Sequence, residues 1–479
     1  MNNSKHIDPQ NFESLNISPD TMAIVKELGY TKMTPIQAES IPALLEGRDL
    51  IGQSKTGSGK TAAFTIPILE QIHVEQSAFR DVQAMILCPT RELCTQVTRE
   101  VRKLGRKKIG LQVLELAGGV PVGPQARALE SGVHIIVGTP GRVLDHLTRR
   151  TLNLSALKII VLDEADRMLD MGFQAEMDEV MSALPEQRQT VLFSATFPAG
   201  IQQLSERFQH QAVMVKIEQT AADAESLSSV EQQFYIVASE NEKVECLMQV
   251  FSKVKPESAI VFCNFKASTF ELTRELASLG VSVACLNGDL EQRDRDLVMA
   301  KFRNQSARVL IATDVAARGI DVADLELVVN FELPQKRENY VHRIGRTGRA
   351  GKAGLAISLI LEREKNKVPG MANASGSAGS EQFIDFEKGI PELVNLEAKM
   401  DTLIILEGRK NKMRPGDILG ALTGEAGGLK SEDIGKIEIH DFFAYVAVSK
   451  NLAKTALMRL QTGRIKGRKV RVEWPKSGV

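Results

Sequence analysis

Short apolar runs alternate with segments of helical periodicity over the first 360 residues. The first set of runs is AMILC (84–88), HIIVG (134–138), KIIVLD (158–163) and TVLFSA (190–195). A second set follows as AIVFC (259–263), RVLIAT (308–313) and LELVVNF (325–331). Strands that are apolar on both faces and separated by helices are typical of a parallel sheet in an α/β fold. The similar order and spacing of the sets predict two similar α/β lobes in tandem, residues 1–220 and 221–365.

The last 80 residues, 400–479, follow a different pattern. Strand-like TLIILEG and helix-like RPGDILGALTG are followed by IGKIEIH, FFAYVAV, helix-like NLAKTALMRLQTG and RKVRVEW. This βαββαβ order predicts a small α+β ferredoxin-like sandwich, the fold of RNA-recognition modules.

The segment 366–399 is predicted to be a flexible linker and connecting segment. Its stretch PGMANASGSAGS (369–380) is rich in Gly, Ser and Ala and has no periodic apolar pattern. A flexible stretch of this length spans roughly 20 Å between its ends. We therefore expect the C-terminal module to move independently of the lobes.

Composition indicates a globular protein of several domains. The chain has 479 residues, of which 43% are hydrophobic and 25% are charged. No apolar run is long enough to cross a bilayer and the polar start MNNSKHIDPQ is no signal peptide, so we expect a cytoplasmic protein without a membrane partner. The scattered cysteines form no C-x-x-C pair, which favours buried free thiols over disulfides or a zinc site; they are Cys88, Cys94, Cys246, Cys263 and Cys285.

Positive charge is concentrated at the C-terminal end of a neutral chain. Residues 400–479 hold 15 Lys and Arg against 9 Asp and Glu, a net charge of +6, whereas the whole chain has a formal net charge of +0. The densest blocks are GRKNKMR (408–414) and GRIKGRKVR (463–471). This pattern indicates a polyanion partner, although a solvated surface of mixed charge is the alternative.

The stretch SKTGSGKT (54–61) follows an apolar run and resembles a phosphate-binding loop. The template asks for Gly, four residues and then Gly-Lys-Ser/Thr, and here Ser54 replaces the first glycine. The loop works through inward-facing backbone N–H groups, so position 54 needs only a small residue. We expect Lys60 to contact the β and γ phosphates and Thr61 to bind Mg²⁺. The expected nucleotide contacts are Ser54, Lys55, Thr56, Gly57, Ser58, Gly59, Lys60 and Thr61.

Two adjacent acids follow a buried strand in IIVLDEAD. Asp163 comes after four apolar residues and would complete the Mg²⁺ site, while Glu164 would polarise the attacking water. A simple helix N-cap is the alternative interpretation, and the phosphate loop about 100 residues upstream argues against it.

The phosphate loop and the stretch DEAD (163–166) together resemble the motifs of the DEAD-box RNA helicases, which belong to helicase superfamily two. Further stretches resemble that family's motifs in order over roughly residues 10–365. They are GYTKMTPIQ (29–37), PTREL (89–93), Gly118-Gly119, TPGR (139–142), SAT (194–196), VFCN (261–264), QRDR (292–295), TDVAARGID (313–321) and HRIGRTGR (342–349). The resemblance implies two RecA-like lobes, ATP as cofactor with Mg²⁺, and RNA-stimulated ATP hydrolysis coupled to local strand separation.

The family resemblance also implies roles for individual residues. Gln37 would read the adenine edge, with Tyr30 packed on the base and Phe12 behind the site. From the second lobe, Gly319 and Asp321 would meet the nucleotide. The arginine fingers would be Arg346 and Arg349. The coupling residues would be Ser194 and Thr196 with Asp166, and His342 across the cleft. The RNA backbone would run along Pro89, Thr90, Arg91, Gly119, Thr139, Gly141, Arg142 and Thr313.

The tail fits the RNA-recognition signature only in part. Its stretch DFFAYVAV (441–448) supplies Tyr445, which either stacks a base or packs within the module, and TLIILEG lacks the usual stacking aromatic. The basic stretch leading into the next helix is the better candidate for RNA contact; it comprises Arg409, Lys410, Lys412 and Arg414.

RPGDILGALTG, DIGKI, YVAV and IKGRKVRV are similar to the bacterial DEAD-box protein A subfamily. That resemblance implies a large-subunit ribosomal RNA hairpin and 50S precursor particles as partners. No coiled coil or large apolar face predicts an oligomer, so a monomer is expected. An ATP-gated RNA clamp, or a general RNA chaperone without ribosomal specificity, is the alternative function.

Overall fold

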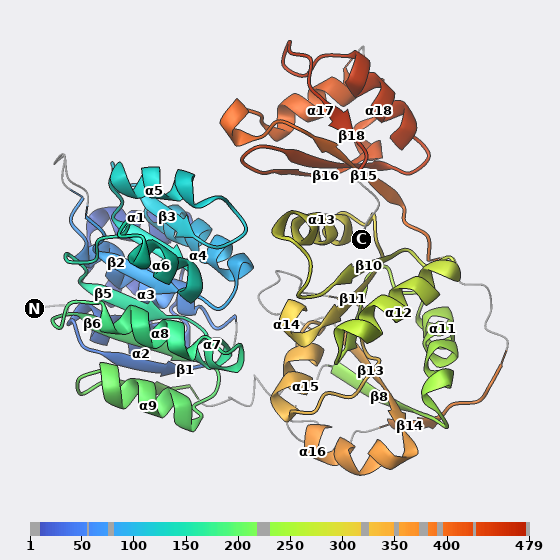
Figure 1. Cartoon of the computed structure of the whole chain (residues 1–479), viewed down its shortest axis with the longest axis horizontal. Coiled ribbons are helices and arrows are strands. Elements are labelled where there is room, and N and C mark those ends of the chain that lie inside the picture. Colours follow the sequence, from blue (N-terminus) through green and yellow to red (C-terminus); the bar gives the residue numbers. More distant parts are fainter. Residues whose placement is uncertain are drawn as a thin grey trace, which may run out of the picture. The chain divides into compact units, whose positions relative to one another are not determined.

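The computed structural model forms two compact units, Met1–Glu218 and Gln219–Val479 (Figure 1). The first unit holds the first lobe, and the second unit holds the second lobe and the C-terminal module. The residues that the structure describes are 10–54, 57–74, 81–217, 230–317, 325–348, 354–372, 382–389, 396–424 and 428–475.

The first unit is built on a parallel seven-stranded sheet. Its strands are β1 (Leu50–Gln53), β2 (Ala84–Leu87), β3 (Val113–Leu116), β4 (Ile135–Gly138), β5 (Ile159–Leu162), β6 (Gln189–Ser194) and β7 (Val213–Lys216). They lie in the order β3-β4-β2-β5-β6-β1-β7. Apart from the two edge strands β3 and β7, every strand is mostly or wholly buried, as the apolar runs predicted.

Helices cover both faces of this sheet. They are α1 (Pro19–Glu27), α2 (Pro35–Leu45), α3 (Lys60–Gln71), α4 (Arg91–Leu104), α5 (Val122–Glu130), α6 (Pro140–Thr148), α7 (Ala165–Asp170), α8 (Gln174–Ser182) and α9 (Ala199–Phe208), preceded by the 3₁₀ turn η1 (Phe12–Ser14). Successive strand side chains alternate between two core clusters, because Ile159 packs with helices α1 to α4 and Ile160 packs with helices α6 to α9.

The second lobe repeats the architecture of the first. Its strands are β8 (Val230–Val237), β9 (Ala259–Cys263), β10 (Val283–Leu286), β11 (Val309–Thr313), β12 (Leu327–Asn330), β13 (Gly354–Leu361) and β14 (Gln382–Asp385). Their order, β10-β11-β9-β12-β13-β8-β14, is the same permutation as in the first lobe, and all the pairs are parallel. The predicted tandem repeat is therefore confirmed.

The helices of the second lobe alternate with these strands. They are η2 (Glu240–Glu242), α11 (Lys243–Val254), α12 (Lys266–Ser278), α13 (Gln292–Arg303), α14 (Asp314–Ala317), α15 (Arg337–Ile344), η3 (Glu362–Lys367) and α16 (Val368–Ala372).

The segment predicted as a linker, 366–399, contributes to the second lobe where the structure describes it. Strand β14 extends the sheet beside β8, with Ile384 and Phe386 packed against the core. Leu396 is fully buried in the same core, and its carbonyl accepts a hydrogen bond from the Ser282 N–H at 3.0 Å. The lobe thus extends past the predicted boundary at residue 365, while residues 373–381 lie outside the described part.

The C-terminal module has the predicted βαββαβ order. It consists of β15 (Met400–Ile405), η5 (Arg409–Asn411), α17 (Pro415–Thr423), η6 (Ser431–Asp433), β16 (Ile434–Ile439), β17 (Ala444–Ser449), α18 (Ala453–Thr462) and β18 (Val472–Glu473). The antiparallel sheet has the order β16-β17-β15-β18, and both helices pack on one of its faces around a common core. This is the predicted ferredoxin-like sandwich.

The opposite face of that sheet contacts helix α13 of the second lobe. Ile404 and Tyr445 form an apolar cluster with Leu297 and Ala300 of the helix. The end of α13 adds polar contacts, which are described with the site below. The module therefore contacts the second lobe within one compact unit.

Candidate functional site

The predicted nucleotide residues of the first lobe gather at the carboxyl ends of three neighbouring strands. The phosphate loop follows β1, Asp163 follows β5, and Ser194 ends β6, and these strands are adjacent in the order β5-β6-β1. Parallel strands present their carboxyl ends at one edge of the sheet, where ligands bind in open α/β folds. The fold thus brings together motifs that lie more than 100 residues apart in the sequence.

The described part of the phosphate loop contains two glycines in the left-handed region, directly before a helix. Gly57 and Gly59 have φ angles of +82° and +93°, which favour glycine, and helix α3 begins directly afterwards at Lys60. The buried Lys60 ammonium donates to the Ser54 carbonyl at 3.1 Å. The Ser54 hydroxyl lies 2.9 Å from the Ser58 hydroxyl, so the serine that replaces glycine bridges the loop without obstructing it. Lys55 and Thr56 lie outside the described residues.

Gln37 is fixed against the phosphate loop. Its Nε2 donates to the Gly59 carbonyl at 3.1 Å, and its Oε1 accepts from the Thr34 N–H at 2.9 Å at the start of helix α2. A Cβ atom at position 59 would lie 2.5 Å from the Gln37 amide nitrogen, so the glycine is needed for this approach. Behind it, the rings of Phe12 and Tyr30 stack with centroids 6.1 Å apart. Of the three predicted adenine-site residues, Gln37 contacts the loop, and Phe12 and Tyr30 contact each other.

Asp163 is a buried carboxylate with an unsatisfied oxygen. Its Oδ1 is among the buried side-chain atoms without a hydrogen-bond partner in the described part of the chain. Burial raises the pKa of Asp163 to about 6, and the nearby Lys60 ammonium opposes that rise. An orphaned carboxylate oxygen suits Mg²⁺, which binds through one or two protein groups and completes its shell with phosphates and water. Consistently, the described residues contain no group of three or more acidic, His or Cys side chains that would hold a metal alone.

Glu164 adopts a backbone conformation that is unusual for its residue type. Its φ is +54°, in the left-handed region, as the last residue before helix α7. The buried Glu164 carboxylate is held by Arg167, whose Nη1 lies 2.9 Å from Oε2. Strained conformations of this kind cluster at functional sites. Sequence reasoning missed Arg167, because an arginine three residues after an acid is a common surface pair on helices.

Three of the four predicted coupling residues, all from the first lobe, contact one another directly. The Asp166 carboxylate accepts from the Thr196 hydroxyl at 2.8 Å and from the Thr196 N–H at 2.9 Å. The Ser194 hydroxyl donates to the Thr196 carbonyl at 2.5 Å. Helix α7 and the end of β6 are therefore linked by charge-assisted hydrogen bonds.

The predicted RNA residues of the first lobe lie at the other half of the sheet edge. Pro89, Thr90 and Arg91 follow β2, Gly119 follows β3, and the remaining three follow β4, and these strands are adjacent as β3-β4-β2. Those three are Thr139, Gly141 and Arg142. Nucleotide and RNA residues thus occupy neighbouring halves of one edge, with β2 beside β5.

A polar network fixes Arg142 in this half. Its guanidinium donates to the Val120 carbonyl at 3.0 Å and to Gln125 Oε1 at 2.6 Å, and His146 lies 3.1 Å from the same oxygen. Burial lowers the pKa of Arg142, which Asp145 partly offsets. Gln125 and His146 were not recognised from the sequence, since neither belongs to a stretch that carries the family resemblance.

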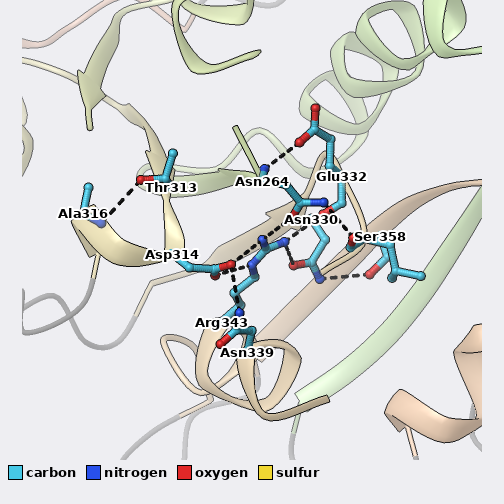
Figure 2. Close-up of polar contacts among 10 residues, drawn as sticks. Asn264, Thr313, Asp314, Ala316, Asn330, Glu332, Asn339, Arg343 and Ser358 are labelled. Carbon is cyan, nitrogen blue, oxygen red and sulfur yellow. Dashed lines mark hydrogen bonds and ion pairs between the residues drawn. The ribbon is translucent and has the colours of Figure 1, made fainter. Parts of the chain in front are cut away.

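In the second lobe, Arg343 connects the elements around Thr313 (Figure 2). Its side chain is 1% exposed, and its five N–H groups reach five oxygens. The acceptors are Asp314 Oδ1 (2.6 Å) and Oδ2 (2.9 Å), Asn330 Oδ1 (3.1 Å), the Glu332 carbonyl (2.7 Å) and Asn264 Oδ1 (2.8 Å). Thr313 itself accepts from the Ala316 N–H at 3.4 Å. Arg343 was not predicted as a site residue, because only the fold shows that VFCN, TDVAARGID and HRIGRTGR converge on it.

The remaining predicted nucleotide residues of this lobe are only partly described. His342 lies in helix α15, and Arg346 follows it, with its carbonyl accepting from the Leu325 N–H at 3.2 Å. Gly319, Asp321 and Arg349 lie outside the described residues.

The C-terminal module separates its predicted RNA residues into two environments. Those in and next to η5 are exposed; they are Arg409, Lys410, Lys412 and Arg414. Tyr445 is 1% exposed, because it packs in the apolar cluster with Leu297 and Ala300 of α13. Of the two alternatives for Tyr445, the structure displays packing.

The module is also tied to the second lobe by polar contacts near the end of α13. Arg303 donates to both Glu438 oxygens, at 2.9 and 2.6 Å. Asn304 Nδ2 donates to the Thr402 hydroxyl at 2.9 Å. Burial alone would raise the pKa of Glu438, but the Arg303 guanidinium outweighs it and leaves the pKa below its ordinary value.

Comparison with known proteins identifies the family. Residues 34–204 match the DEAD/DEAH box helicase family, residues 242–351 the helicase conserved C-terminal domain, and residues 402–474 the DbpA RNA binding domain. The ATP-dependent RNA helicase DbpA of Escherichia coli (strain K12) is 48% identical over 462 residues, which cover 96% of this chain and 98% of that relative. This chain belongs to the DEAD-box ATP-dependent RNA helicases.

Another relative and a solved structure match about three quarters of the chain. The DEAD-box ATP-dependent RNA helicase CshA of Bacillus subtilis is 44% identical over 355 residues, 74% of this chain and 70% of the relative. Among solved structures, S. cerevisiae Dbp5 bound to RNA and ADP BeF3 is 30% identical, covers 78% of this chain and 96% of its own, and has a TM-score of 0.67. This DEAD-box chain is thus an ATP-dependent RNA helicase with an RNA-binding domain of the DbpA type. Among the described residues, no helix is both long and apolar enough to cross a membrane.

Proposed function

We propose that this helicase separates short RNA duplexes next to a large-subunit ribosomal RNA hairpin during assembly of the 50S particle, as a cytoplasmic monomer. The supporting observation is the exposed basic segment Arg409–Arg414 on a module that matches the DbpA RNA binding domain. The module binds the target RNA, and the two lobes carry out ATP-driven strand separation. The lobes alone grip the phosphate and sugar backbone and therefore do not read sequence.

The nucleotide chemistry is assigned to the first lobe. Lys60 and the nest of the phosphate loop bind the β and γ phosphates, and Thr61 and Asp163 would hold Mg²⁺, which neutralises developing charge on the phosphates when it is bound. Glu164, held by Arg167 at 2.9 Å, orients the attacking water. Gln37 and the Phe12–Tyr30 pair select adenine.

Coupling to RNA follows from the sheet edge. The Asp166–Thr196 hydrogen bond links the acidic motif to the end of β6. A conformational change caused by the γ phosphate at the acidic motif would therefore be transmitted to that strand. The nucleotide residues of the second lobe, Arg346 with Gly319, Asp321 and Arg349, complete the site on closure, with His342 as a linking residue. In related NTPases an arginine finger contributes about 10³–10⁵ in rate.

The test is steady-state ATP hydrolysis by the full chain with a large-subunit ribosomal RNA fragment, a small-subunit fragment, polyadenylate or DNA. We expect strong stimulation by the large-subunit fragment only. A variant with Arg409, Lys410, Lys412 and Arg414 changed to Ser should respond to all the RNAs weakly and alike. Equal stimulation of the unaltered chain by every RNA would contradict ribosomal targeting and leave a general RNA chaperone.

A further inference from the structure

The sheet face of the C-terminal module is not free to receive RNA in this structure. RNA-recognition modules ordinarily stack bases on aromatic side chains of this face. Here Tyr445 is buried against α13, and Phe443 packs at the edge of the same cluster while its ring stacks on His440 at 4.6 Å. An RNA bound by the module must therefore use another surface.

Two loops at one end of the sheet form such a surface. The turn that contains η5 and the turn between β16 and β17 are joined by backbone hydrogen bonds, from the Arg409 N–H to the His440 carbonyl at 2.8 Å and from the Lys410 N–H to the Asp441 carbonyl at 2.9 Å. A Cβ atom on Gly408 would lie 2.2 Å from the His440 oxygen, so the glycine permits the contact. The two loops thus hold each other in place.

Phe442 stands at the tip of the second loop with 68% of its surface exposed. Its neighbour Phe443 packs against His440 and the cluster that contains Tyr445, so the two adjacent rings lie on different surfaces of the module. Isolated exposed apolar residues are common on proteins, and exposure alone would mean little. The difference here is that Phe442 is carried on a loop bonded to the exposed cations Arg409 and Lys410.

A third loop adds further positive charge. The Lys466 ammonium donates to the Lys412 carbonyl at 3.1 Å, which brings the turn between α18 and β18 to the same end of the module. Arg464 and Arg468 in that turn are also exposed. Two acids partly neutralise this charge, because Asp441 lies 3.3 Å from Arg409 and Asp417 lies 3.6 Å from Lys466.

We propose that Phe442 stacks on an unpaired base of the RNA whose backbone is held by these three basic loops. Proteins that bind single-stranded RNA combine a cationic track with a few aromatic rings, and one stacked base contributes about 1–3 kcal/mol. The ligand is therefore a looped or single-stranded RNA segment rather than a continuous duplex, whose stacked bases are closed to a side chain. This inference rests on the proposed function, in which the same module recognises RNA.

The test is the dissociation constant of the full chain for a large-subunit ribosomal RNA fragment, measured over a range of salt. Phe442→Ala should weaken binding about 5- to 150-fold, which is 1–3 kcal/mol at 1.4 kcal/mol per tenfold, and leave the salt dependence unchanged. Arg409→Ser, in contrast, should lower the salt slope because it removes a phosphate contact. Met458→Ala is the matched control, because Met458 is 58% exposed on α18 of the same module.

Phe442→Trp in a Trp474→Phe background provides a direct readout, since the chain has one tryptophan. Binding should be retained, and RNA should quench the fluorescence. The stacking proposal is overturned if Phe442→Ala binds within twofold of the unaltered chain, if Met458→Ala loses as much, or if the fluorescence does not respond. Equal binding of every RNA by the unaltered chain would contradict only the ribosomal assignment. The same variants would then test stacking on any of those RNAs.

Discussion

The serine that stands in place of the first glycine of the phosphate loop makes two contacts within that loop. The Ser54 hydroxyl contacts Ser58, and the Ser54 carbonyl accepts from Lys60. The sequence predicts that a small residue is tolerated at this position, because the chemistry of the loop depends on backbone groups. The central position of Arg343 was not predictable, because its partners come from three separate stretches of sequence that only the folded lobe brings together.

The buried Asp163 carboxylate should lower the stability of the nucleotide-free protein. Its pKa of about 6 lies above the ordinary value of 3.8, so the folded state holds the proton more tightly, and stability falls as pH rises from about 4 to about 6. Asp163→Asn cannot ionise, and we expect it to be on the order of 2–3 kcal/mol more stable at pH 8, with the gain vanishing below pH 4.

The measurement for this prediction is the unfolding of the first lobe at several pH values, with EDTA and without ATP. The same variant should lose ATP hydrolysis. A variant that is less stable than the unaltered chain at every pH would show that the carboxylate is stabilised by its surroundings.

Arg343→Lys should loosen the second lobe although it keeps the charge. A lysine ammonium has three donors at one point and cannot reach Asn264 and Asn330 as well as Asp314. Each buried oxygen left without a donor costs roughly 1–3 kcal/mol. Hydrogen exchange of the β9, β11 and β12 amides should therefore accelerate by more than tenfold. Arg337→Lys, an exposed position on the same helix, should have no effect, and unchanged exchange in Arg343→Lys would refute the assignment.

Strands and helices were largely predictable from the sequence, and their tertiary partners were not. Buried apolar runs identified half of the parallel strands, namely β2, β4, β5, β6, β9, β11 and β12, since strands covered on both faces leave a clear pattern. Strand β14 was missed because it is short and mostly exposed and lies beside a Gly- and Ser-rich stretch. The contact of α13 with the module was missed for another reason. From the sequence, Tyr445 could be either a residue that stacks on a base or part of an apolar interface.

The contact between α13 and the module should depend on the Arg303–Glu438 pair. Arg303→Glu places two carboxylates together in a half-buried position, and losing such a pair typically costs 2–5 kcal/mol. We expect the α13 amides to exchange faster and distances between labels on the second lobe and the module to broaden. Adding Glu438→Arg should restore both. Arg274→Glu, on the exposed face of α12, is the matched charge reversal and should change neither. Failure of the double variant to recover would argue against this contact.

The complete chain combines two similar lobes with a module that packs on the second. Strand β14 and Leu396 belong to the second lobe although they come shortly before the module in the sequence, so a truncation before β14 would damage this lobe as well as remove the module. Full-length variants are therefore the cleaner way to separate targeting from catalysis. The account requires that a target held by the module is unwound by lobes that do not read sequence.

The most direct test is ATP-dependent release of a short RNA strand annealed beside a large-subunit ribosomal RNA hairpin, compared with the same duplex joined to an unrelated RNA. We expect fast release from the ribosomal substrate, slow release from the other, and none without ATP. Equal rates on both substrates would contradict targeting by the module. Tight ATP-dependent binding with no release would contradict strand separation and indicate an RNA clamp.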